Sequence, residues 1–188
     1  MKAGALLLLA LFSSGVTTSA FALKHGAPRT QPIDLVVIHS TGGPTCDEKT
    51  GAVVWVKGGT LVDNLREIER HPRLGIHYMI DRDGTVAASV PESRLAHHVF
   101  THSGRSIAIE LVNDGDGRDP FPEAQLSGLI DLLKDIARRR GLGPAAIKRH
   151  SDLDTGTLPC ARNQRRKVDP GYAFPYRSVL ERTFESRE

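Results

Sequence analysis

The chain has 188 residues, of which 39% are hydrophobic and 25% are charged, and its formal net charge is +3. This length suits a single domain with a sizeable core. The small net charge gives no signal for nucleic-acid binding, although it weakly favours contact with an anionic polymer.

The first residues are typical of a targeting segment. Lys2 precedes an apolar run over residues 3–12, and residues 20–22 (Ala-Phe-Ala) provide a small-residue cleavage site. The run is shorter than the ~20 residues that a membrane span needs. We therefore expect residues 1–22 to be a secretory signal peptide and residues 23–188 to form one periplasmic or secreted domain without a stable membrane anchor. An uncleaved N-terminal anchor is the alternative.

The first half of the domain carries the signals of a strand, a helix and a hairpin. Near-continuous apolar character over residues 33–39 predicts a central strand covered on both faces. Residues 60–70 predict a helix with Thr60 as its N-terminal cap. Residues 76–81 and 85–90 predict a β-hairpin, because the Asp-Gly pair between them favours a tight turn.

The second half continues the alternation of strands and helices. Residues 106–113 predict another buried strand, and residues 123–140 predict the clearest helix, which Gly141 ends. Residues 146–150 predict a short strand, and a last short helix is expected near the C-terminus. Interleaved strands and helices with one hairpin indicate an α/β fold with a mixed central β-sheet flanked by helices.

Four polar residues stand where a buried core is expected. His39 ends the first strand, Glu110 interrupts the 106–113 strand, and His150 ends the short strand. Asp169 follows in the segment Lys-Val-Asp-Pro-Gly. Burying such groups without a partner is costly. Two histidines and an aspartate at strand ends therefore suggest a zinc ion in an open cleft.

The residue types also suggest chemistry at that zinc ion. Two imidazoles and one carboxylate leave a fourth position open, as in catalytic zinc sites, where the ion activates a water and polarises a carbonyl. Glu110 suits a proton shuttle. Lys167 lies on the same side of an extended segment as Asp169 and suits stabilisation of a negative carbonyl oxygen. Lys167 equally suits a solvated basic run with Arg165 and Arg166.

The chain contains two cysteines, Cys46 and Cys160. An even pair in an exported protein favours a disulfide bond. Such a bond would join the two loops that follow His39 and His150. Two free buried thiols or a thiol nucleophile are the alternatives.

Five segments together resemble the zinc-dependent N-acetylmuramoyl-L-alanine amidases of the type-2 amidase family, which share their fold with peptidoglycan recognition proteins. The resemblance covers roughly residues 33–180, and it is specific because all five segments occur in the same order as in the family. The segments are residues 36–41, 75–84, 106–111, 149–152 and 167–171.

The resemblance implies a zinc amidohydrolase that cleaves the amide between N-acetylmuramic acid and L-alanine in peptidoglycan or muropeptides. It implies His39, His150 and Asp169 as zinc ligands, with Glu110 and Lys167 as catalytic residues. We further expect no nucleic-acid partner and a monomer.

His98 matches a cleft histidine of the family and is a candidate substrate contact. A hydrogen-bonded surface histidine is the other interpretation of this position.

Two positions depart from the family pattern. Ile76 occupies the place of a tyrosine found near the metal in phage-type members, which assigns the catalytic role to Glu110. The stretch between His150 and Asp169 is longer than usual, so Asp152 and Asp154 are fallback ligands. Asp152 could instead orient a ligating imidazole or cap a turn.

Two other functions compete with the amidase. One is a non-catalytic peptidoglycan-binding module of the same fold, which retention of the full residue set disfavours. The other is a cysteine peptidase that would use Cys160 or Cys46 with His150. The sequence does not distinguish intact polymer from soluble muropeptides, or recycling from attack.

Overall fold

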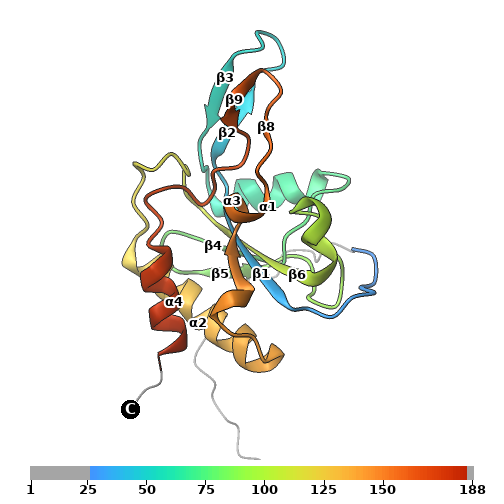
Figure 1. Cartoon of the computed structure of the whole chain (residues 1–188), viewed down its shortest axis with the longest axis vertical. Coiled ribbons are helices and arrows are strands. Elements are labelled where there is room, and N and C mark those ends of the chain that lie inside the picture. The colour runs from blue at the N-terminus through green and yellow to red at the C-terminus, as the bar shows by residue number, and fades with distance from the viewer. Residues whose placement is uncertain (1–25, 186–188) are drawn as a thin grey trace, which may run out of the picture.

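A five-stranded mixed sheet forms the centre of the protein (Figure 1). The computed structural model describes residues 26–185, so the expected signal peptide lies outside the described residues. The strand order is β5-β4-β6-β1-β7. The strands are β1 (Leu35–Ser40), β4 (Tyr78–Ile80), β5 (Val86–Ala88), β6 (Ser106–Leu111) and β7 (Ile147–Arg149).

Only the β4–β5 pair of this sheet is antiparallel; β1 pairs in parallel with β6 and β7, and β4 pairs in parallel with β6. This arrangement confirms the expected α/β class with a mixed sheet. The parallel strands are buried on both faces, which explains why β1 and β6 are apolar almost throughout.

Helices cover both faces of the sheet. The helices are α1 (Leu61–Arg70), α2 (Glu123–Arg140), α3 (His150–Leu153) and α4 (Tyr176–Phe184), with short 3-10 turns η1 (Phe100–Arg105) and η2 (Pro144–Ala146). On one face, α2 and α4 form a core with alternate residues of β1 and β6. On the other face, Leu61 and Leu65 of α1 pack with Met79 and Ala108. The central strands are thereby shielded from water.

Local signals set the helix ends as the sequence predicts. The Thr60 side chain accepts a hydrogen bond from the Asp63 N–H at the start of α1. Gly141 ends α2 in the left-handed conformation at φ 65°, where a side chain would be unfavourable.

The prediction that a strand runs over residues 146–150 is wrong at its C-terminal end. β7 stops at Arg149, and His150 is the first residue of α3. The cause is Asp152, whose carboxylate accepts the Arg149 N–H at 3.0 Å and turns the chain into a helix. Of the two roles considered for Asp152, the structure therefore supports the cap.

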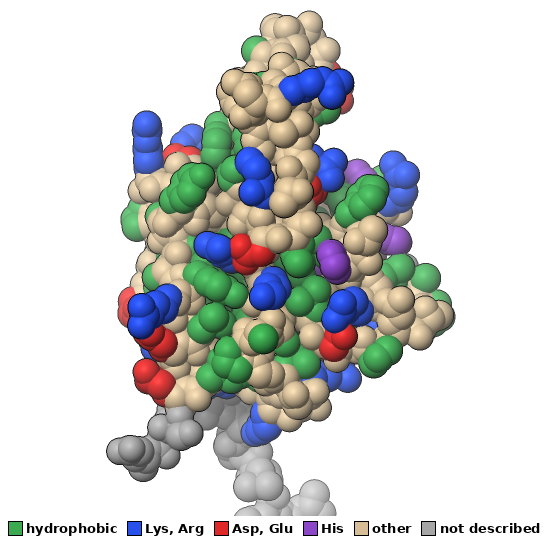
Figure 2. Space-filling view, viewed as in Figure 1, with side chains coloured by type: hydrophobic (Ala, Val, Ile, Leu, Met, Phe, Trp, Pro, Cys, Tyr) green, Lys and Arg blue, Asp and Glu red, His purple; other side chains and the backbone are tan. Residues whose placement is uncertain are grey.

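Two small hairpins form an arm that the sequence did not predict. They are β2 (Gly43–Cys46) with β3 (Val53–Val56), and β8 (Thr157–Leu158) with β9 (Ala161–Arg165). The arm stands clear of the main body, as the space-filling view also shows (Figures 1 and 2). The hairpins come from distant parts of the sequence and flank one end of the central sheet.

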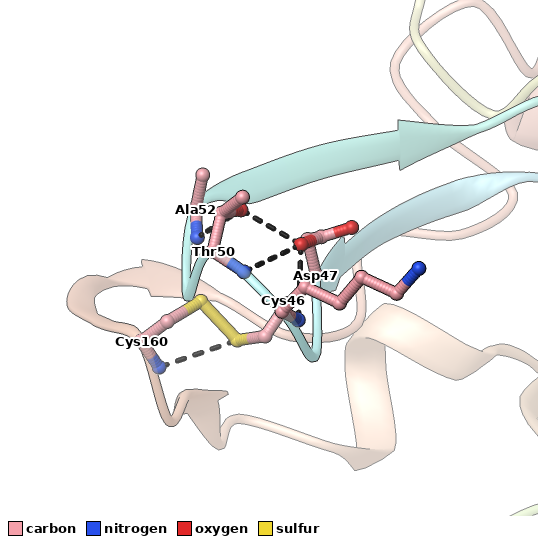
Figure 3. The surroundings of a disulfide bond; sticks show 6 residues. Cys46, Asp47, Thr50, Ala52 and Cys160 are labelled. Atoms are coloured by element: carbon pink, nitrogen blue, oxygen red, sulfur yellow. Dashed lines mark hydrogen bonds between the residues drawn. A yellow bond between two sulfur atoms is a disulfide. The ribbon is translucent and has the colours of Figure 1, made fainter.

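A disulfide between Cys46 and Cys160 joins the two hairpins (Figure 3). Its cysteines are 114 residues apart in sequence, and their Cα atoms are 5.9 Å apart. The predicted disulfide is confirmed, and the alternatives of free thiols or a thiol nucleophile are wrong. Within residues 26–185, no helix is long and apolar enough to cross a membrane.

We predict that replacing both cysteines by serine lowers the free energy of unfolding by about 2–5 kcal/mol, because the unfolded chain loses a long-range constraint. Urea unfolding at neutral pH measures the change. Wild-type protein in reductant should match the double variant, and Gln164→Ser on exposed β9 is the control. An unchanged unfolding midpoint for the double variant would contradict the prediction.

Candidate metal centre and catalytic cleft

The strand register builds the centre of the site. His39 pairs with Glu110 in the parallel β1–β6 ladder, so both residues stand at the carboxyl ends of their strands. His150 follows β7, the other neighbour of β1. The Ser151 N–H donates to the Asp169 carbonyl at 3.1 Å and brings the later segment alongside. Residues far apart in sequence thus converge at one end of the sheet.

His39, His150 and Asp169 form a buried group that could hold a metal ion. The His39 and His150 Nδ1 atoms are 2.9 Å apart, and Asp169 Oδ2 lies 3.2 Å and 2.9 Å from them. One ligand atom from each residue lies within 4.8 Å of the others. Two nitrogen donors and one carboxylate suit zinc with an open fourth position.

The two fallback aspartates have other partners. Asp152 pairs with Arg149, and its contacts belong to the start of α3. Asp154 pairs with Arg166 at 2.8 Å. Asp154 Oδ2 also lies 4.0 Å from the Nε2 atom of His150, on the side of the ring away from the buried group. The buried metal-binding group contains neither of them.

Burial and hydrogen bonding put His39 and Asp169 in the protonation states that a metal requires. Burial lowers the pKa of His39 to about 4, against an opposing effect of Asp169, so the imidazole is neutral at pH 7. Burial would raise the pKa of Asp169, but the hydrogen bonds from His150 and His39 outweigh it and lower that pKa. His39 therefore offers a neutral nitrogen and Asp169 an ionised carboxylate.

Glu110 lies next to this group, and one of its carboxyl oxygens lacks a hydrogen bond among the described residues. Its Oε2 atom is buried and has no hydrogen-bond partner among the described residues. Burial raises the pKa of Glu110 to about 8, with a further increase from Asp169 and an opposing effect of Lys167. A carboxyl group with a pKa near neutrality is suited to accepting and releasing a proton.

His98 is a partly buried residue in direct contact with His39. Its Nδ1 atom is 2.9 Å from His39 Nε2, and its Nε2 atom is 2.9 Å from Ser106 Oγ. Burial, followed by the neighbouring histidines, lowers the pKa of His98 well below its usual value. His98 is hydrogen-bonded, as one of the two interpretations expected, but it is partly buried against His39 and not at the open surface.

The group opens into a cleft of about 290 Å³. The buried group, Glu110 and the exposed Lys167 line it. The disulfide-linked arm contributes part of the lining, and further lining residues, most of them apolar, come from α1, from the segment between α1 and β4 and from the segment before η1. The arm contributes Gly43, Pro44, Thr45 and Val56, Arg166 follows it, and the other lining residues include Ile68, Leu74, Ile76 and His97.

Sequence reasoning missed two kinds of site residue. Ser106 contacts His98 on the side away from the metal-binding group, and Val56 of the arm and Arg166 next to it line the cleft. Asp154, expected as a fallback ligand, instead faces the Nε2 atom of His150. Ser106 opens an apolar strand, and an isolated polar residue there is a weak signal that the sequence does offer. The arm residues carry no comparable pattern, because their hairpins are short and exposed.

Comparison with known proteins finds amidases of one family. Residues 29–172 match the profile of the N-acetylmuramoyl-L-alanine amidase family. The chain is 33% identical over 107 residues to the N-acetylmuramoyl-L-alanine amidase AmiD of Escherichia coli, a match covering 49% of this chain and 36% of AmiD. It is also 25% identical over 173 residues to RC0497 of Rickettsia conorii, whose given name is that of an N-acetylmuramoyl-L-alanine amidase. This match covers 86% of this chain and 57% of RC0497.

The fold of a solved relative agrees. A structure of Escherichia coli AmiD in complex with anhydro-N-acetylmuramic acid-L-Ala-D-γ-Glu-L-Lys superposes with a TM-score of 0.62 at 24% identity, covering 90% of this chain and 62% of that one. The chain therefore spans less than two thirds of the length of these relatives.

We predict that Glu110→Gln stabilises the metal-free protein at high pH. The folded pKa is about 8, above the usual value of 4.5, so wild-type stability falls relative to the variant as pH rises through this window. Unfolding in urea with a chelator should show a variant that is more stable by roughly 2–4 kcal/mol at pH 9 and equal to wild type near pH 4. Exposed Glu48→Gln is the control. A difference independent of pH would refute the assignment.

Proposed function

The chain belongs to the N-acetylmuramoyl-L-alanine amidase family, and we propose that it hydrolyses the amide bond between N-acetylmuramic acid and L-alanine in peptidoglycan or muropeptides. One observation carries the proposal: a buried two-histidine, one-aspartate group lines a cleft together with Glu110, whose buried Oε2 atom has no hydrogen-bond partner among the described residues. Domain boundaries of 23–188 are part of the proposal.

We propose zinc as the resident metal, held by His39, His150 and Asp169. The donor set fits, because both imidazoles aim Nδ1 at one point and the Asp169 carboxylate neutralises part of the charge of the ion. When bound, a zinc ion would polarise the scissile carbonyl and increase the acidity of the attacking water.

Glu110 would move the proton in this reaction. It would accept a proton from the attacking water and deliver it to the nitrogen of the departing L-alanine. Its pKa of about 8 in the metal-free protein makes both transfers accessible near neutral pH. A cation bound next to it would lower that pKa and favour the carboxylate that the first transfer needs.

Lys167 would stabilise the negative charge that develops on the carbonyl oxygen. It lines the same cleft as Glu110 and Asp169, and its side chain is exposed there. An ammonium group aimed at a developing oxyanion lowers the barrier without proton transfer.

We propose that the protein works in the periplasm or outside the cell. The sequence over residues 1–22 supports export, and the Cys46–Cys160 disulfide supports an oxidising compartment. The relative AmiD was solved with a muramyl tripeptide, which supports muramyl peptides as the substrate class.

We predict that purified protein releases new L-alanine N-termini from sacculi, and that a strong chelator abolishes this release. Amino-group labelling of the soluble products measures it, and adding back zinc should restore it. Activity that persists in chelator would exclude a metal mechanism, and an absence of release with bound zinc would favour a non-catalytic binding module.

We predict that Glu110→Gln keeps stoichiometric zinc but reduces turnover by ~10²-fold or more, since the proton shuttle is lost. Metal analysis and initial rates on a soluble muropeptide measure the two quantities. Glu48→Gln should match wild type in both. Wild-type turnover in the Glu110 variant would remove this residue from the mechanism.

A further inference from the structure

The two ring nitrogens of His39 face different partners. Nδ1 points at the ligand atoms of His150 and Asp169, whereas Nε2 is 2.9 Å from the Nδ1 atom of His98. A nitrogen that binds a metal carries no proton. With a metal on Nδ1, His39 would no longer donate to Asp169 through that atom; the proton of the neutral ring would lie on Nε2, and His98 Nδ1 would accept it.

This assignment fixes the direction of every following hydrogen bond. His98 accepts through Nδ1, so its own proton lies on Nε2, which donates to Ser106 Oγ at 2.9 Å. The Ser106 hydroxyl then donates to the His102 carbonyl at 2.8 Å. Each donor meets one acceptor, and the chain ends on a backbone oxygen that has no proton to return.

The supporting residues are held by rigid structure. Ser106 is fully buried and is the first residue of β6, paired with Leu35 of β1, the strand that carries His39. Ser103 Oγ accepts the His98 and Val99 N–H groups at 3.2 Å and 3.0 Å. His39 and Ser106 therefore lie on two directly paired strands, β1 and β6, and the hydrogen-bond chain ends at His102 in η1, immediately before β6.

We propose that His98 is a positioning residue that holds His39 in the Nε2–H tautomer and orients its ring toward the metal. The inference rests on the proposed zinc site and replaces the expected substrate contact of His98. Both ring nitrogens are already used by His39 and Ser106, which leaves neither to bind substrate. Partners of this kind typically change metal affinity by ~10–100-fold.

The second imidazole ligand is supported differently. His150 Nε2 faces the Asp154 carboxylate at 4.0 Å, and Arg166 pairs with that carboxylate. His39 instead has a neutral support. This chain of uncharged hydrogen-bonding groups orients the His39 ring. It adds no second negative charge, besides that of Asp169, near Glu110, whose burial already opposes ionisation.

The first test needs no variant. Long-range ¹⁵N–¹H NMR of the zinc-loaded protein should show both His39 and His98 as Nε2–H tautomers, with His39 Nδ1 shifted by the metal. A His98 ring protonated on Nδ1 would overturn the proposal, because that nitrogen could not accept from His39.

The second test measures zinc affinity by competition with a chromophoric chelator. His98→Ala should weaken zinc binding by ~10–100-fold, and Ser106→Ala by a smaller factor. His98→Gln, which can accept from His39 and donate to Ser106, should restore part of the loss. His97→Ala, removing the exposed neighbouring histidine, is the matched control for zinc affinity.

The outcomes separate this inference from the proposed function. Tight zinc binding that is unchanged in both His98 variants would refute the positioning role and leave the amidase intact. Failure of the wild-type protein to bind zinc would refute the amidase mechanism itself. If His98→Ala does not fold, Ser106→Ala and the wild-type NMR spectrum still decide the question.

Discussion

The parallel pairing of β1 with β6 is the constraint on which the site depends. It aligns His39 with Glu110 at one end of the sheet, and pairing of β1 with β7 delivers His150 beside them. A shift by one residue in either register would turn the polar side chains toward the opposite face. The apolar residues that precede each polar one therefore specify the site as well as the core.

The burial that positions these residues also disfavours the charged forms of the Asp169 and Glu110 carboxyl groups. Asp169 finds compensation in the hydrogen bonds from two imidazoles, whereas Glu110 Oε2 finds none among the described residues. An apolar residue in place of Glu110 would remove that penalty. Retention of a costly carboxyl group beside a metal-binding group is understandable if its raised pKa is used for proton transfer.

Much of this arrangement could be predicted from sequence because it follows from regular periodicity. The strands of the sheet and the helix over Glu123–Arg140 come from apolar spacing, and the metal-binding group comes from polar residues that interrupt it. The end of β7 could not be predicted in this way, because a single cap by Asp152 decides it. Nor could the arm, whose short exposed hairpins lack a buried face to impose a pattern.

The predictable sheet and the unpredicted arm have different roles in the site. The sheet positions His39, Glu110 and their neighbours through long-range pairing. The arm, with exposed apolar side chains such as Val56, shapes only the approach to them. Because its hairpins share little buried core with the sheet, the Cys46–Cys160 bond supplies the constraint that packing does not. The cleft wall can thus vary in sequence while the register that builds the centre stays unchanged.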